Sequence, residues 1–140
     1  MTARIPAAEY RKSEFTINLP WPSSALSSNA RGHWRIKANA NKVARSAAWA
    51  LAREAKINKP MPDAMLVFTI YPPDNRRRDI QNMPHMLKAY IDGIADAMGC
   101  DDHGFEVDFP PRFAEAKKGG VVVCEVRPRT VILPIRGVIS

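Results

Sequence analysis

The sequence of 140 residues has little cysteine, which argues against a fold held together by disulfide bonds or by zinc. Cys100 and Cys124 are its only cysteines, and neither belongs to a C-x-x-C pair or to a histidine spacing that suits zinc. The sequence therefore suggests neither a disulfide framework nor a zinc site. Cys124 follows three valines, which predicts a buried and inert thiol.

Long apolar runs are also missing. No segment approaches the roughly 20 apolar residues that a membrane span needs, and residues 1–6 lack the continuous apolar stretch of a signal peptide. Internal repeats and low-complexity segments are absent as well. We therefore expect a soluble, cytoplasmic protein without a membrane partner.

Acidic residues are fewer than basic ones. The 14 acidic and 21 basic residues give a net charge of +7 and an isoelectric point near 9.8. Such an excess favours polyanionic partners, because each phosphate that is neutralised releases counterions, although many proteins are basic for solubility alone. The length fits one domain, and 46% apolar residues suffice for an ordinary core.

Hydrophobic patterning predicts the order strand, helix, strand, helix, strand, strand. Apolar and polar residues alternate from Phe15 to Leu19, whereas residues 37–56 repeat apolar side chains at three-and-four spacing. The run from Met65 to Tyr71 is almost continuously apolar, as in a central strand buried on both faces. The expected elements are a strand at 15–19, a helix at 37–56, a strand at 65–71, a helix at 83–98, and strands at 105–109 and 121–126.

Prolines and glycines give further detail. Asn82 is a plausible N-cap for the second helix. Pro110 and Pro111 interrupt the third strand, which indicates an edge strand or a bulge. Residues 117–120 read Lys-Lys-Gly-Gly, which predicts a hairpin turn into the last strand.

The ends and one internal segment lack periodicity. We expect residues 1–13 to form a loose arm before a domain at 14–127. Residues 23–35 are rich in small, polar and basic side chains, which predicts a long loop. Residues 128–140 are more apolar than a solvated tail, and we expect this extension to pack on a partner subunit.

Residues 74–82 concentrate positive charge between the second strand and the second helix. Arg76, Arg77 and Arg78 are consecutive, and on a short loop they can fan along a phosphate backbone with bidentate geometry. The alternative is a solvated basic turn.

Isolated carboxylates accompany this charge. Asp79 lies directly beside Arg78, and Asp101 and Asp102 follow a helix that can return the chain to the same edge. Carboxylates within a basic surface oppose DNA binding unless a cation offsets them. A hard divalent ion held by carboxylate and phosphate oxygens is the usual reason for such a pattern.

The second helix adds a cation to this set. His85, Lys88 and Asp92 fall on one polar face of residues 83–98. Lys88 either neutralises charge that develops on a scissile phosphate or forms an ordinary surface ion pair with Asp92. The residues alone leave both interpretations open.

Basic and aromatic residues also gather before the first helix. We expect Arg35 and Lys37 to contact a DNA backbone, together with the three arginines and Lys88. His33 and Trp34 either contact or stack on nucleic acid, or Trp34 is a core aromatic.

Four groups of residues together form a fairly specific pattern, although each alone is weak. They are Leu19-Pro20-Trp21-Pro22-Ser23, Pro73 to Asp79 with Asn82, Leu87 to Ile94, and Asp101-Asp102 followed by Val107. From about Phe15 to Val126, the chain resembles the RusA-type Holliday junction resolvases, small endonucleases typical of phages and prophages.

The resemblance implies an α+β fold, with helices packed on a mixed sheet, in an intertwined homodimer. It implies Mg²⁺-dependent cleavage, with Mn²⁺ as an alternative, of two symmetric strands of a four-way DNA junction in recombination and repair. The implied setting is the cytoplasm of a phage-infected or prophage-carrying bacterium. Residue by residue, Asp79 matches the first essential carboxylate, Asp102 the last, with Asp101 beside it, and Lys88 the essential lysine.

Gln81 departs from the family pattern, which places a second aspartate two residues after the first. An amide oxygen can still reach a metal, but it removes one negative charge, so the affinity for Mg²⁺ should fall. Either Asp101, Asp102 or Asp92 compensates, or the protein grips branched DNA without cutting it. The candidate catalytic residues are Asp79, Lys88 and Asp102, and the candidate metal ligands are Asp79, Asp102, Asp101 and Gln81.

The leading hypothesis is thus a metal-dependent endonuclease that nicks branched DNA in pairs. The competing hypothesis is a catalytically silent junction-binding protein of the same fold. A third possibility is that the basic stretch binds something other than DNA.

Overall fold

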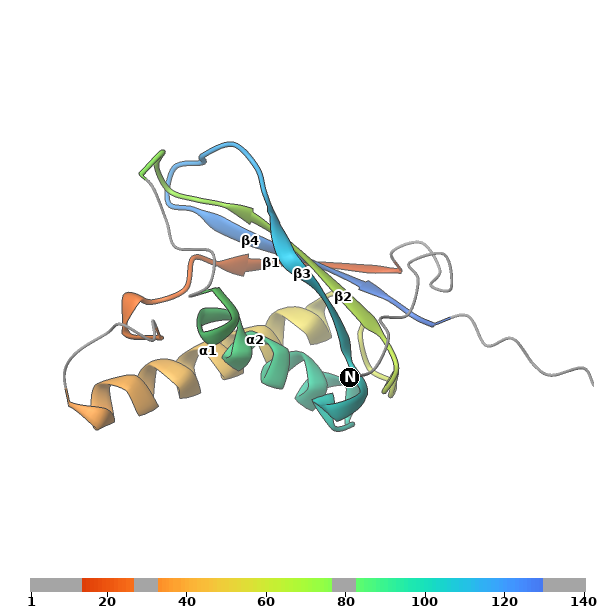
Figure 1. The fold of residues 1–140 in the computed structure, drawn as a ribbon. Helices are drawn as coiled ribbons and strands as arrows, with labels where there is room; N and C mark the ends of the chain where they lie inside the picture. Colours follow the sequence, from red (N-terminus) through yellow and green to blue (C-terminus); the bar gives the residue numbers. More distant parts are fainter. Residues whose placement is uncertain (1–13, 27–32, 77–82, 130–140) are drawn as a thin grey trace, which may run out of the picture.

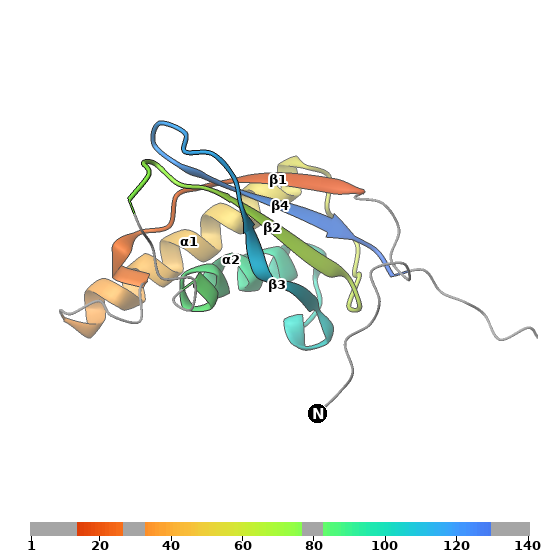
Figure 2. The same cartoon turned by 45° about the horizontal axis from the view of Figure 1, so that its top comes forward.

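The protein is an α+β domain in a computed structural model that describes residues 14–26, 33–76 and 83–129. A four-stranded sheet carries both of the described α-helices on one face (Figures 1 and 2). The elements are β1 (Phe15–Pro20), η2 (Ser24–Leu26), α1 (Trp34–Glu54), β2 (Met65–Tyr71), α2 (Met83–Met98), η4 (Asp102–Gly104), β3 (Glu106–Phe113) and β4 (Val121–Arg127).

The sheet is mixed, with strand order β1-β4-β2-β3. β4 runs antiparallel to both β1 and β2, whereas β3 is parallel to β2. The predicted order of strands and helices is confirmed, and so is the interior position of β2. The predicted hairpin is wrong, because β2 lies between β3 and β4. The Gly120 amide donates to the Lys117 carbonyl at 2.8 Å, but the turn carries the chain past β2 instead of joining paired strands.

The core lies between the sheet and the helices. Leu66, Phe68 and Ile70 of β2 are buried together with alternate residues of β1 and β4. The α1 helix meets this layer through small residues, since its fully buried positions are Ala44, Ala48 and Ala52. Cys124 is also buried, as predicted, and burial raises the pKa of its thiol.

The two helices approach each other closely at Gly93 of α2. A Cβ atom there would lie 2.2 Å from the Arg45 carbonyl oxygen and 2.8 Å from the Cβ of Ala48. Beside this crossing, Arg45 donates from Nε to Asp96 Oδ2 at 2.6 Å and from Nη2 to Asp96 Oδ1 at 2.9 Å. The absence of a side chain at Gly93 lets the helices approach closely, and the bidentate Arg45–Asp96 pair links them beside that contact.

The first helix begins earlier than the periodicity predicted. It starts at Trp34 and not at Lys37, because the His33 side chain accepts a hydrogen bond from the Arg35 amide at 3.1 Å and so caps the helix. The predicted loop at 23–35 is therefore wrong at residues 34 and 35, which belong to α1. It is also wrong at residues 24–26, which form the short helix η2. Val43, expected on the apolar face, is 60% exposed.

The third strand continues through its prolines. It extends to Phe113, so the predicted interruption at Pro110 and Pro111 is wrong. Of the two predicted alternatives, the edge position is confirmed, because β3 ends the sheet. The register of β3 against β2 also shifts between Val67 and Thr69. An edge strand tolerates proline, since one side of its backbone needs no strand partner.

Several predictions fall on residues outside the described ranges. These are the loose arm at 1–13, the Asn82 cap, and the extension from residue 130 onward. Among the described helices, none has the length and apolar character needed to cross a membrane.

Candidate active site

The α2 helix presents Lys88 at the molecular surface. Its bounds, Met83–Met98, agree with the prediction, because its apolar residues form one continuous face against the core. Lys88 and Asp92 lie one turn apart outside that face, and the Lys88 Nζ donates to Asp92 Oδ1 at 2.9 Å. The Lys88 side chain is 56% exposed, whereas the Asp92 side chain is only 25% exposed.

A second carboxylate reaches Lys88 from outside the helix. Gly99, with a φ of 74°, ends α2 by donating its amide to the Ala95 carbonyl at 3.0 Å. Asp101 then caps η4 by accepting the His103 amide at 2.9 Å. This reversal places Asp102 Oδ2 2.5 Å from Lys88 Nζ. The predicted return of Asp101 and Asp102 to the edge that carries Asp79 stays a prediction, because Asp79 lies outside the described residues.

These hydrogen bonds shift the pKa values of Lys88 and Asp102. The hydrogen bond to Asp102, followed by that to Asp92, raises the pKa of Lys88. The hydrogen bond from Lys88 is the main cause that lowers the pKa of Asp102. At neutral pH the site is therefore an ammonium held between two carboxylates. The surface ion pair with Asp92 is present, but Lys88 also makes the contact with Asp102 that an ordinary helix pair lacks.

Arg76 lies in the segment that follows β2, and it is the last described residue before the gap at 77–82. Asp74 holds it, because Asp74 Oδ1 accepts the Arg76 amide at 2.9 Å and Oδ2 accepts from Nη2 at 3.1 Å. The Arg76 side chain remains 78% exposed. The other predicted site residues of this segment, Arg77, Arg78, Asp79 and Gln81, lie outside the described residues.

A complete metal site is not assembled by the described part of the chain. No three histidine, cysteine, aspartate or glutamate side chains lie together there in a way that could hold a metal ion. Asp101 and Asp102 offer the hard oxygen donors that Mg²⁺ prefers. They would need further ligands, and the expected ones, Asp79 and Gln81, are outside the described ranges.

A groove of about 340 Å³ runs beside Lys88, between α2 and β3. Its walls are mostly apolar, and Asp108 is its one acidic member. In the sequence, Asp108 is only one of the polar residues that alternate with apolar ones in the strand expected at 105–109. No local signal distinguishes it, because its nearness to Lys88 arises from the packing of β3 beside α2. The lining residues are Phe68, Pro84, Leu87, Lys88, Ile91, Val107, Asp108, Phe109 and Pro111.

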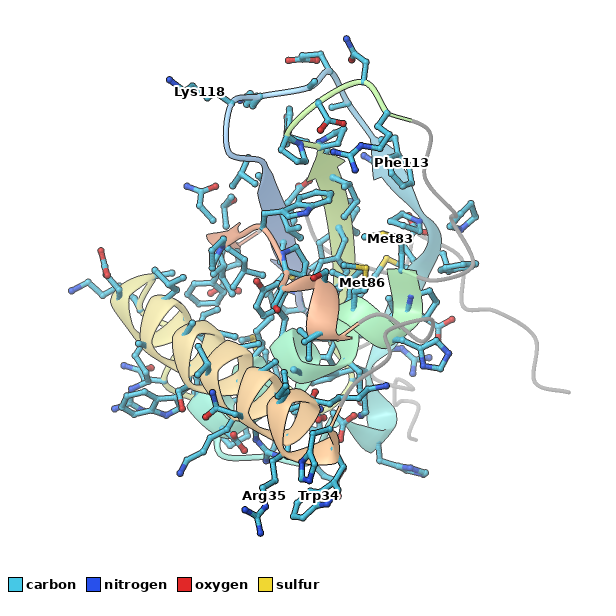
Figure 3. All side chains as sticks on the ribbon, turned by 90° about the vertical axis from the view of Figure 1, so that its left-hand side faces the viewer. Trp34, Arg35, Met83, Met86, Phe113 and Lys118 are labelled. Atoms are coloured by element: carbon cyan, nitrogen blue, oxygen red, sulfur yellow. The ribbon has the colours of Figure 1, made fainter. Side chains whose placement is uncertain are left out.

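The predicted DNA-contacting residues of α1 lie in its first turn. Arg35 and Lys37 are exposed, and Trp34 is 68% exposed, so the alternative of a core aromatic at Trp34 is wrong. Figure 3 shows Trp34 and Arg35 projecting from the end of α1, away from the sheet.

The fold and the site define an α+β domain that presents a lysine between two aspartates on an exposed helix face. The chain is 40% identical over 115 residues to an uncharacterized protein of Xylella fastidiosa (strain Temecula1 / ATCC 700964), and the match covers 79% of this chain and 74% of that protein. The chain therefore belongs to the same family as this protein. No protein-family model matches the chain. Membership of the RusA-type resolvases accordingly stays a prediction from the motifs.

Proposed function

We propose that the protein is a metal-dependent endonuclease of the RusA type, which nicks branched DNA such as four-way junctions. The observation that carries the proposal is the Lys88 ammonium, which contacts Asp92 at 2.9 Å and Asp102 at 2.5 Å. Two consecutive elements, α2 and η4, thus bring together a cation and a carboxylate that the resemblance assigns to catalysis. An ordinary ion pair on the surface of one helix would join Lys88 to Asp92 only and would not include Asp102.

Lys88 is suited to charge stabilisation in phosphoryl transfer. Its raised pKa keeps it protonated at neutral pH, and its half-exposed ammonium is accessible to a phosphate oxygen. Asp92 and Asp102 restrict its position before the substrate arrives, which reduces the cost of orientation. Exposed Arg76, which follows β2, can contact the DNA backbone.

Asp102 and Asp101 would contribute to holding Mg²⁺, with Mn²⁺ as an alternative, together with Asp79 and Gln81. When bound, the ion would supply charge neutralisation and a water of lowered pKa. Lys88 uses one oxygen of Asp102, and a carboxylate has further acceptor positions for a second cation. A homodimer would present this site twice, as symmetric cleavage of a junction requires.

The second candidate function is junction binding without cleavage, and Gln81 favours it. Glutamine stands where the resemblance places a second metal-binding aspartate, so the site has one negative charge fewer. The same charged surface would then bind branched DNA without activating water.

A nicking assay on a synthetic four-way junction separates the two candidates. We expect symmetric, ligatable nicks in Mg²⁺ or Mn²⁺, and their loss in Asp79→Asn and Asp102→Asn. Lys88→Ala should slow single-turnover nicking by roughly 10²- to 10³-fold, the range seen when one stabilising donor is removed. The matched control is Lys118→Ala, which removes an exposed lysine in the turn before β4, at the opposite end of the molecule from Trp34 and Arg35 (Figure 3), and should leave the rate unchanged.

The binding alternative predicts a different outcome of this assay. Tight, junction-specific binding with no nicking in either metal would reject the nuclease. If Gln81→Asp then created nicking, the missing carboxylate would be the cause of the inactivity.

A further inference from the structure

The beginning of α1 carries an aromatic and cationic cluster that the proposed chemistry does not use. It consists of His33, Trp34 and Arg35, and we call it the α1 cluster. The His33 and Trp34 rings are stacked, with centroids 5.6 Å apart and an angle of 29° between their planes. The Arg35 guanidinium carbon lies 5.4 Å from the centroid of the Trp34 ring.

The cluster is open to solvent and positively charged. Trp34 is 68% exposed, the largest exposed fraction among the large apolar side chains that the structure describes. The first turn of α1 has no acidic residue, and neither Arg35 nor Lys37 forms an ion pair with any described residue. An exposed aromatic face with cations beside it suits a ligand that has both a flat apolar face and negative charge.

We propose that the α1 cluster stacks on a nucleotide base at the branch point of DNA, with Trp34 as the platform and Arg35 and Lys37 on the adjoining phosphates. This inference rests on the proposed branched-DNA substrate. Within a continuous duplex both faces of each base are covered by its neighbours. A branch point interrupts that stacking and exposes base faces. The α1 cluster would therefore recognise the break in base stacking and not the base sequence of the DNA.

The position of the cluster fits this role. Both helices begin toward the same side of the molecule (Figures 1 and 2), and Lys88 lies in the second turn of α2. The α1 cluster and Lys88 are therefore both displaced from the Gly93 crossing toward the N-terminal ends of their helices. A branch point held at Trp34 would send an arm of the DNA along the face that presents Lys88.

Trp49 provides a comparison within the same helix. It also has an arginine over its ring, since the Arg53 guanidinium carbon lies 5.9 Å from the ring centroid. However, Trp49 is only 45% exposed, and in the surface depression beside it the Arg45 guanidinium is already held by both carboxylate oxygens of Asp96. Trp49 is thus a matched control, namely an exposed tryptophan with a cationic neighbour that we do not expect to stack on DNA.

The test measures binding in EDTA, so that it does not depend on nicking. Trp34→Ala should weaken binding to a four-way junction by about 5- to 150-fold, the range for the loss of one stacked base, and should change binding to a continuous duplex far less. Trp49→Ala should leave both affinities near the wild-type values, and Trp34→Phe should restore part of the junction affinity. In a variant with Trp34 as the sole tryptophan, the junction should quench the tryptophan fluorescence more than the duplex does.

The outcomes separate this inference from the proposed function. Equal junction affinity of Trp34→Ala and wild type, or an equal loss on junction and duplex, would overturn the stacking role even if nicking is normal. Trp34-dependent junction binding by a protein that never nicks would support stacking while rejecting the nuclease. A protein that binds no branched DNA would overturn both.

Discussion

At the residue scale, the ion pair between Lys88 and Asp102 has a defined response to pH. Lys88 lowers the pKa of Asp102, so the stability that Asp102 contributes is present above its unfolded pKa of about 3.9 and is lost as pH falls through the lower folded pKa. Asp102 and Asp92 raise the pKa of Lys88, so its contribution is present below about 10.4 and is lost as pH rises through the higher folded pKa. Because the groups are partly exposed, solvent screening keeps this contribution to unfolding small.

The corresponding prediction is a shift of the Asp102 titration. In an NMR titration of side-chain carboxyl groups, Asp102 should titrate below the usual value of about 3.9, and Lys88→Met should return its pKa toward that value. Asp96, whose lowered pKa depends on Arg45, serves as the control and should not move. An Asp102 pKa that is the same in both proteins would contradict the described pairing.

At the element scale, the crossing of α1 and α2 depends on Gly93. Gly93→Ala should lower the free energy of unfolding by about 1 to 3 kcal/mol, because the new Cβ would meet the Arg45 carbonyl oxygen at 2.2 Å. This loss should appear although alanine is favoured over glycine by about 1 kcal/mol within a helix.

Urea denaturation measures this loss, with Ala50→Gly as the comparison. Ala50 is exposed on α1, so its replacement reports helix propensity alone and should cost about 1 kcal/mol. A stabilised Gly93→Ala variant would mean that the helices separate more easily than the described packing allows.

At the scale of the whole molecule, the proposed function predicts that the net charge of +7 governs DNA affinity. The logarithm of the binding constant should fall linearly with the logarithm of salt concentration, with a slope of about −0.9 for each phosphate contacted. Arg76→Gln should make this slope smaller by roughly one and weaken binding to all DNA similarly, while Lys118→Ala should not alter it. Binding that does not depend on salt would point to a partner other than DNA.

The two helices differ in how accurately the sequence predicts their bounds. The bounds of α2 were predicted correctly because its apolar residues recur without interruption and Gly99 ends it. The start of α1 was predicted three residues late, since the His33 cap belongs to a polar segment without periodicity. Likewise, β3 continues beyond Pro110 because its place at the sheet edge tolerates proline, and edge position is a property of the assembled sheet.

By itself, the sequence determined the order of the elements, the buried strand β2, and the candidate residues Lys88 and Asp102, because periodicity and residue chemistry are local properties. Only the tertiary structure decided that Lys88 Nζ lies 2.5 Å from Asp102 Oδ2, that Asp108 shares the groove beside Lys88, and that Trp34 is exposed. These facts depend on where Gly99 turns the chain and on how closely Gly93 lets α1 approach α2. Distances between residues far apart in sequence follow from packing, which no local pattern specifies.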